Sequence, residues 1–380
     1  MKKILLACYR RVIWFFFTLL PIQRKKIVLI SFGGAPYGGN PKYIAETLLA
    51  SHTKFKLIWL TKGKPERASV PEGIRAVRFQ STAAFYHIAT ARVWVNNARN
   101  FYYNKRKKQF YINTWHGFAL KQIEKDAISK LPAGYAAMAI ADSKAIDLII
   151  SEASFMTKIY KQSFWYDGEV WEIGSPRNDI IINQRDGALC KKVHEAFSLP
   201  KDKKIILYAP TFRADCSLDC YRLDYAALRD ACERKFGGEF VTLVRLHPKI
   251  AQKCSEVCEY TDTVLNASPY PDMQELLVAA DIVVTDYSSL MFDFSLSLKP
   301  CFQFATDIED YKRDRNFYFP IESLPFPLAT SNEELKENIQ NFNLEEFQNG
   351  VNAFFDKVGM VREGRSAEKC CTLISDLCSK

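Results

Sequence analysis

The sequence lacks the segments and motifs that mark several broad classes of protein. Its longest apolar run, 12–21, is about half of the ~20 residues that a membrane-spanning helix needs. The chain contains no internal repeat or low-complexity segment, and the Gly33-Gly34 turn after its first predicted strand is not a G-x-G-x-x-G dinucleotide motif. No nucleic-acid motif gathers the basic residues, which are scattered along the chain. We therefore expect no spanning helix, no dinucleotide cofactor and no nucleic acid partner.

Metal-binding patterns are equally scarce. The 11 cysteines are an odd number spread along the chain, which is typical of reduced thiols in a cytosolic protein. The pairs Cys216/Cys220 and Cys254/Cys258 could suggest zinc, but neither pair has C-x-x-C spacing and no histidine accompanies them. No acidic cluster has metal-ligand spacing. We expect no metal and no cofactor.

The composition indicates a two-domain globular protein with an anionic partner. At 380 residues, with 48% hydrophobic and 25% charged residues, the chain is long enough for two α/β domains. Its formal net charge of +9 favours a nucleotide, a phosphopolymer or an acidic membrane surface as a partner.

The first 25 residues form an aromatic segment flanked by cations. Arg10-Arg11 precede the apolar run, and basic residues follow it at 24–26. No small-residue cleavage site follows, which argues against an exported signal peptide. This pattern is typical of a helix lying in a membrane interface, although a helix packed on the protein's own core would look similar. Both interpretations stay open at this stage.

Strand and helix patterns alternate from residue 26 onward, which predicts doubly wound parallel sheets. We expect a helix over 144–155, and another over 187–197 just before the polar boundary between domains near residue 200. A helix with a capping box is expected over 331–342, and two further helices, 352–358 and 366–378, are expected to close the chain. The predicted strands are 27–32, 55–60, 74–79, 92–96, 110–113, 135–141, 169–173, 204–208, 240–246, 282–285 and 300–304.

Residues able to perform chemistry follow several of these strands. His116 comes after strand 110–113 and could act as a general base, because an imidazole accepts a proton near neutral pH. A structural histidine bonded to a loop carbonyl beside Trp115 fits the pattern equally well. Arg177, after strand 169–173, could contact an anion or pair locally with Asp179.

The second half of the chain repeats this arrangement. Three successive strands end at Arg213, at Arg245 with His247, and at Ser288 with Ser289. Ligands of open α/β sheets bind at the carboxyl ends of the strands. Asp286 and Ser288 favour a helix start, where free backbone amides could hold a phosphate.

Taken together, these motifs resemble the CDP-glycerol glycerophosphotransferase family, whose members build teichoic acids and related phosphopolymer capsules. The resemblance covers residues 27–340 and implies two Rossmann-like domains of the GT-B type facing a central cleft. It also implies a peripheral protein on the cytoplasmic face of the cell membrane. The motifs that carry it are Asn40-Pro41-Lys42-Tyr43, Trp115-His116-Gly117, Gly174-Ser175-Pro176-Arg177-Asn178-Asp179, Ala209-Pro210-Thr211-Phe212-Arg213, Arg245-Leu246-His247-Pro248 and Thr285-Asp286-Tyr287-Ser288-Ser289.

The resemblance assigns a role to each matching residue. It implies that His116 deprotonates an acceptor hydroxyl and that His247 acts at the donor diphosphate. The donor nucleotide and phosphates would be held by Arg213, Arg245, Thr285, Asp286, Ser288 and Ser289. The acceptor side or supporting positions would be Asn40, Lys42, Trp115, Gly117, Asp126, Arg177 and Asp293. The chain departs from the usual family pattern at Phe118-Ala119 and at Phe212, which concerns acceptor identity more than the reaction.

The resulting expectation is a glycerophosphotransferase that moves glycerol phosphate from CDP-glycerol to a hydroxyl of a lipid-linked or phosphopolymer acceptor and releases CMP. Its expected parts are a membrane-interface helix (1–25), an acceptor domain (26–199), a CDP-donor domain (200–345) and closing helices (346–380). A CDP-ribitol-dependent ribitol phosphotransferase, a nucleotide-sugar glycosyltransferase of the same architecture and a non-catalytic phosphopolymer-binding protein are the alternatives. The sequence fits a primase and a polymerase alike.

Overall fold

The computed structural model divides into two compact units, each built on a parallel sheet. Unit 1 contains residues 1–116, 124–179 and 363–380, and unit 2 contains residues 117–123 and 180–362. The predicted boundary at residue 200 therefore lies inside unit 2, and the predicted closing segment 346–380 is shared between the units. The structure describes residues 2–34, 37–65, 70–99, 104–183, 187–213, 218–247, 250–251, 254–314 and 316–379.

Unit 1 is organised around a seven-stranded sheet in the order β3-β2-β1-β4-β5-β6-β7, with every pair parallel. The β1 strand lies near the middle, with Ile27 opposite Leu57 of β2 and Val93 of β4. Buried β-branched runs of this kind form strands covered on both faces. The strands are β1 Gln23–Ile30, β2 Lys56–Thr61, β3 Ile74–Arg78, β4 Ala91–Asn96, β5 Phe110–Asn113, β6 Leu148–Ser151 and β7 Glu169–Glu172.

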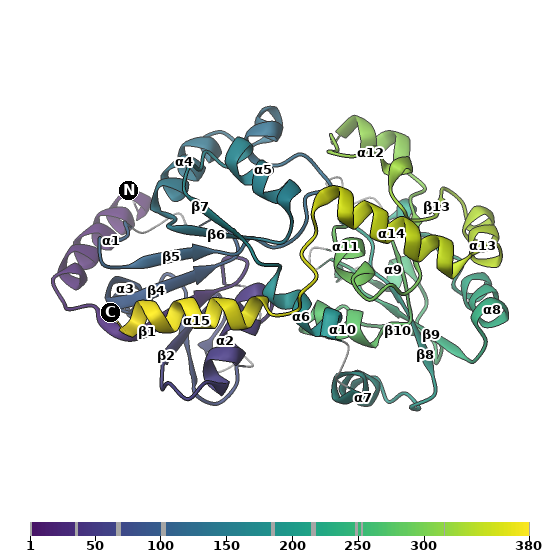
Figure 1. Ribbon diagram of the computed structural model, residues 1–380, viewed down its shortest axis with the longest axis horizontal. Coiled ribbons are helices and arrows are strands. Elements are labelled where there is room, and N and C mark those ends of the chain that lie inside the picture. Colours follow the sequence, from purple (N-terminus) through teal and green to yellow (C-terminus); the bar gives the residue numbers. More distant parts are fainter. Residues whose placement is uncertain are drawn as a thin grey trace. The chain divides into compact units, whose positions relative to one another are not determined.

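Helices cover both faces of this sheet (Figure 1). The α2 and α15 helices pack on one face, where Ile27 and Leu29 join a core that includes Cys370 and Ile374 of α15. Since strand side chains alternate, Val28 and Ile30 point to the opposite face, which α3 covers. The helices are α1 Lys2–Thr18, α2 Gly39–Ala50, α3 Thr82–Thr90, η2 Glu124–Lys130, α4 Tyr135–Ala145, α5 Ser154–Ser163, η3 Pro176–Asn178 and α15 Ser366–Ser379.

Unit 2 contains a six-stranded parallel sheet in the order β10-β9-β8-β11-β12-β13. The predicted α/β class with two Rossmann-like units is therefore confirmed. The strands are β8 Lys204–Tyr208, β9 Phe240–Val244, β10 Val264–Asn266, β11 Ile282–Thr285, β12 Cys301–Phe304 and β13 Leu328–Ala329. The helices are α6 Asp179–Asn183, α7 Gly187–Ala196, η4 Asp219–Tyr221, α8 Tyr225–Phe236, α9 Cys254–Val257, α10 Met273–Ala279, α11 Leu290–Ser295, α12 Ile308–Asp314, η6 Ile321–Ser323, α13 Asn332–Gln340 and α14 Leu344–Val358.

Two sequence predictions in unit 1 are wrong. The segment 135–141, predicted as a strand, is the first part of helix α4, and the predicted helix 144–155 contains strand β6. Alanine-rich 135–141 has high intrinsic helix propensity, and Gly134 in a left-handed conformation starts the helix. The short run 148–151 is apolar and buried at every position, which fits an inner strand.

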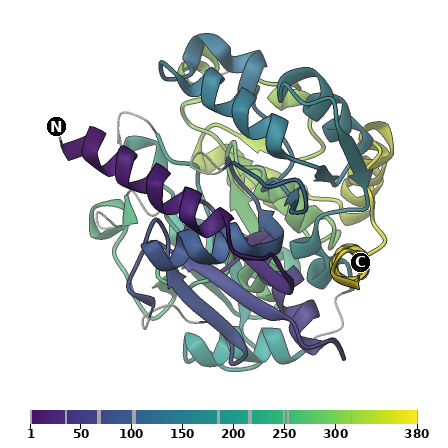
Figure 2. The same cartoon turned by 90° about the vertical axis from the view of Figure 1, so that its left-hand side faces the viewer.

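The N-terminal helix α1 lies against α3 (Figure 2). Tyr9 hydrogen-bonds Thr82, and the Phe17 ring contacts Tyr86 with centroids 5.7 Å apart. Its other side carries Phe15 and Phe16, which are 61% and 60% exposed. Within the described part of the chain, no helix combines the length and apolarity that crossing a bilayer requires.

Candidate functional site

His116 follows β5 on a tight turn. The Trp115 amide donates to the Asn113 side chain at 2.8 Å, and Trp115 adopts a left-handed φ of 45°. This turn directs the imidazole toward the carbonyl of Asn97, a residue of the segment after the neighbouring strand β4. The distance from Nδ1 to that carbonyl oxygen is 2.7 Å. A carbonyl can only accept, so Nδ1 carries the proton and Nε2 of the neutral ring keeps its lone pair.

The surroundings of His116 keep the ring neutral. Burial lowers its pKa to about 4, and the positive charge of Arg177 acts in the same direction, against the hydrogen bond to Asn97. The ring packs between Trp115, whose centroid is 4.1 Å away, and Phe32 at 5.5 Å. The structure thus shows the loop-bonded histidine that the sequence left as one alternative, and the role of His116 as a base stays a prediction.

Asn40, at the start of α2, joins three segments around this turn. Its amide nitrogen donates to the carbonyls of Thr114 and Trp115, and its oxygen accepts from the Ser175 hydroxyl and the Arg177 amide. Asn40 is 1% exposed. It therefore positions the histidine turn and does not face solvent as a ligand would.

Arg177 also supports the His116 turn. Its guanidinium donates to the His116 carbonyl at 2.6 Å. Asp179, its predicted local partner, accepts from the amides of Ser366 and Ala367 at the start of α15. Arg177 thus holds the backbone of His116, and Asp179 caps the helix α15 near the end of the chain.

The remaining acceptor-side residues have diverse environments. Lys42 is buried to 6% exposure, 4.0 Å from Glu46 and over the ring of Tyr43. Gly117 has a φ of 140°, in the region that favours glycine, at the point where the chain passes from unit 1 to unit 2. Asp126 accepts a hydrogen bond from Ser163 at the end of α5.

In unit 2, Arg213 is the centre of a buried ionic network. Its guanidinium pairs with Asp307 at 2.6 and 2.9 Å and with Asp286 at 2.9 Å, and it donates to the Thr211 carbonyl. Burial alone would lower the pKa of Arg213, but the hydrogen bonds to Asp307 and the charge of Asp286 raise it. These bonds occupy most of the guanidinium, so Arg213 fixes the loop after β8.

Asp286 and Thr285 also connect strand ends. Asp286 accepts from the Thr211 amide at 2.8 Å, and the Thr285 hydroxyl donates to the Ala209 carbonyl at 2.7 Å. Both side chains are at most 1% exposed. They hold the loop after β8 against the end of β11.

Ser288 and Ser289 lie at the end of β11 and are partly exposed. The following helix α11 has only six residues, so its dipole adds little to anion binding, and the Ser289 side chain makes no capping bond. Asp293, one turn further, accepts from Gln274 at 3.3 Å inside the unit.

His247 and Arg245 follow β9. The His247 ring is exposed and lies 5.3 Å from Phe212, and the Arg245 guanidinium donates to the Tyr270 carbonyl at 2.6 Å. Burial lowers the pKa of Arg245. Pro248 and Lys249 of this motif lie outside the described residues, as do Cys216 and Arg315.

Sequence reasoning missed several residues that shape these sites. Asn97 and Phe32 contact His116, and Asp307 pairs with Arg213. Tyr287 and Tyr311 stack on each other at 3.9 Å beside that pair. Asn97 follows a predicted strand and Phe32 is the last residue of another, so position at a strand end was a usable signal. Asp307 had no signal beyond its charge. Among the described residues, no group of three or more His, Cys, Asp or Glu side chains could hold a metal ion.

Comparison with known proteins gives a consistent result. The family described as CDP-Glycerol:Poly(glycerophosphate) glycerophosphotransferase matches residues 12–376. A teichoic acid poly(glycerol phosphate) polymerase of Staphylococcus epidermidis is 33% identical over 93% of this chain, which spans 51% of that relative's length. A teichoic acid glycerol-phosphate transferase of Staphylococcus aureus is 28% identical over 94% of this chain and 95% of its own length.

A solved structure of a variant of the wall teichoic acid polymerase TagF soaked with CDPG has a TM-score of 0.83 and 31% identity. The match covers 94% of this chain and 90% of that chain. It includes both parallel-sheet units and confirms the expected GT-B-like fold.

Proposed function

The chain belongs to the CDP-glycerol:poly(glycerophosphate) glycerophosphotransferase family, and on this basis we propose that it transfers glycerol phosphate from CDP-glycerol to a hydroxyl of a membrane-associated acceptor. CMP is the second product, and the polymer is a teichoic acid or a related capsule. The observation that carries the proposal is the neutral imidazole of His116, whose Nδ1 is bonded to the Asn97 carbonyl so that Nε2 can accept a proton.

The reaction is a direct displacement at phosphorus. The acceptor oxygen forms a bond to the donor phosphorus that carries glycerol, its proton passes to Nε2 of His116, and the bond from that phosphorus to the bridging oxygen breaks. CMP leaves with the electron pair of that bond. Positioning and charge neutralisation supply most of the acceleration in phosphoryl transfer.

We assign the donor side to residues at the strand ends of unit 2. Exposed His247 acts at the diphosphate, with Arg245 and the hydroxyls of Ser288 and Ser289 as further phosphate ligands. Arg213 has a positioning role in this proposal, because its donors are used by Asp286 and Asp307. The combined substitutions Ser288→Ala and Ser289→Ala should weaken CDP-glycerol binding measured by calorimetry; an unchanged Kd would remove these serines from the site.

We further propose that α1 associates with an anionic membrane surface on the cytoplasmic face. One side of α1 packs on α3, and apolar side chains on its other side are exposed. The same helix therefore fits both interpretations of the N-terminal sequence, a helix packed on the protein's own core and a helix in a membrane interface. Arg10, Arg11, Arg24 and Lys25 supply the cations that attract anionic lipids, whereas Lys26 is buried. The exposed apolar residues are Tyr9, Val12, Phe15, Phe16, Leu19 and Leu20.

The decisive experiment is a donor panel with a synthetic lipid-linked acceptor. CDP-glycerol, CDP-ribitol and UDP-sugars are supplied in turn, and mass spectrometry identifies the product and the released nucleotide. The proposal expects CMP and a product heavier by glycerol phosphate. A ribitol phosphate product, or release of a nucleoside diphosphate from a UDP-sugar, would support the corresponding alternative.

The same assay tests the base and the absence of a metal requirement. His116→Ala should lower turnover by about 10²- to 10⁴-fold, the usual contribution of a general base, while donor binding stays intact. His194→Ala is the matched control, since His194 bonds only backbone carbonyls of its own region. Turnover lost in EDTA and restored by magnesium would contradict metal independence, and turnover near the wild-type rate in His116→Ala would contradict the base.

A further inference from the structure

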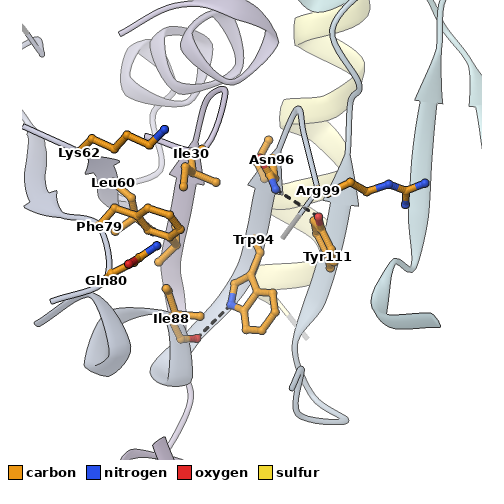
Figure 3. Close-up of a pocket in the computed structure, with 13 residues that line it drawn as sticks. Ile30, Leu60, Lys62, Phe79, Gln80, Ile88, Trp94, Asn96, Arg99 and Tyr111 are labelled. Atoms are coloured by element: carbon orange, nitrogen blue, oxygen red, sulfur yellow. Dashed lines mark hydrogen bonds between the residues drawn. The ribbon is translucent and has the colours of Figure 1, made fainter. Parts of the chain in front are cut away.

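A cavity of about 140 Å³ lies in unit 1, on the side of the sheet covered by α3 (Figure 3). It reaches the carboxyl edge of the sheet, because Gly33 and Asn96 line it. These residues are the chain neighbours of Phe32 and Asn97, which contact His116. Its walls are mostly apolar and include Val28, Ile30, Leu60, Ile88, Trp94 and Val95.

Apart from Lys62 and Gln80 at the rim, the polar side chains that line the cavity are bonded to other protein groups. The Trp94 indole donates to the Ile88 carbonyl at 3.0 Å, and the Asn96 amide donates to the Tyr111 hydroxyl at 3.3 Å, as the dashed lines in Figure 3 show. Arg99 turns away and pairs with Glu124 at 2.7 Å. The interior is therefore suited to an apolar ligand, since a polar one would lose its hydrogen bonds to water.

The rim of the cavity has a different character. Lys62 is exposed and forms no ion pair with any described residue. Gln80, also on the rim, accepts a hydrogen bond from Arg10 of α1 at 2.9 Å. The opening thus combines an available cation with the helix whose apolar side chains are exposed.

The size indicates what the cavity can hold. An apolar cavity of about 150 Å³ stays dry and binds a benzene-sized hydrocarbon. We propose that this cavity binds the first few carbons of the hydrocarbon chain of the lipid that carries the acceptor, with the lipid's phosphate at Lys62 and the rest of the chain outside the cavity. This assignment rests on the proposed function, and the position of Gly33 and Asn96 next in the chain to the residues that contact His116 favours the acceptor lipid over a bulk membrane lipid.

Direct binding can be tested with dodecyl phosphate, used below its critical micelle concentration in calorimetry. Leu60→Phe fills the cavity and should weaken binding at least 10-fold. Leu57→Phe is the matched control, because Leu57 lies on the same strand but packs in the core on the opposite face. That variant should bind dodecyl phosphate as the wild type does. Glycerol 3-phosphate, which has no chain, should not bind at this site.

Lys62→Gln provides a test that does not depend on core packing. It should weaken dodecyl phosphate several-fold and leave the uncharged dodecyl maltoside unchanged. The proposal would be overturned by dodecyl phosphate binding at wild-type strength to both Lys62→Gln and Leu60→Phe. Cooperative unfolding of Leu60→Phe is the check that this variant is folded. These measurements need no turnover, so they can succeed even if the proposed reaction is wrong.

Kinetics then distinguish the two sources of hydrocarbon. Leu60→Phe should raise KM at least 10-fold for a lipid-linked acceptor and leave KM for a chain-free acceptor within 2-fold. In the opposite outcome, Leu60→Phe loses dodecyl phosphate binding but its KM is unchanged for both acceptors. That result would mean that a membrane lipid occupies the cavity, and it would overturn the acceptor assignment.

Discussion

The pH dependence of turnover gives the sharpest test of His116. Its pKa is lowered to about 4, chiefly by burial, from an ordinary value near 6.5. The proposed base is active when neutral, so activity is expected above the pKa and is lost below it. At pH 5.5 a pKa of about 4 leaves roughly 97% of the ring neutral, whereas a pKa of 6.5 would leave about 9%. Between pH 7.5 and 5.5, protonation of His116 should therefore lower kcat/KM by less than about 2-fold.

The assay is CMP release at low CDP-glycerol concentration, where kcat/KM reports groups of the free enzyme. The ordinary pKa of a histidine side chain lies near 6.5, so the profile is measured in parallel for His247→Asn. An acid limb that disappears in this variant belongs to His247. A roughly 10-fold decrease centred near pH 6.5 that persists in His247→Asn would refute the reasoning about His116.

Three further predictions concern the supporting structure. Asn40→Ala removes four hydrogen bonds around the His116 turn and should lower kcat at least 10-fold with an unchanged CDP-glycerol Kd; an unaffected kcat would contradict its positioning role. Arg213→Leu leaves Asp286 and Asp307 without their buried cation and should lower the free energy of unfolding, measured in urea, by about 3–5 kcal/mol. Adding Asp307→Asn should recover part of this loss, and a loss under about 1 kcal/mol in Arg213→Leu would show that the network is dispensable. Burial lowers the pKa of His87 to about 4, so its contribution to stability is present above pH 6.5 and is lost as the pH falls toward 4. The wild type should lose up to about 3 kcal/mol more than His87→Leu between pH 7 and pH 4, and equal losses would exclude this contribution.

The places where the sequence misled are those where a short apolar segment has no clear period. Residues 135–141 contain alternating alanines and larger apolar side chains that suit a strand or a helix, and the helix propensity of the alanines with the left-handed Gly134 before them favours the helix. Strands β10 and β13 have only three and two residues, which is too short for a detectable pattern. The buried runs of β1, β8 and β11 were predictable because each is continuous and apolar.

The sequence by itself determined the α/β class, the position of His116 after a strand and the family to which the chain belongs. These features depend on local periodicity and on the order of motifs, which are written along the chain. Only the tertiary structure decided which imidazole nitrogen carries the proton, because the Asn97 carbonyl comes from a neighbouring strand end. It also decided that Arg213 binds Asp307, 94 residues away, since a charge pattern does not say which partner folding will bring within hydrogen-bond distance.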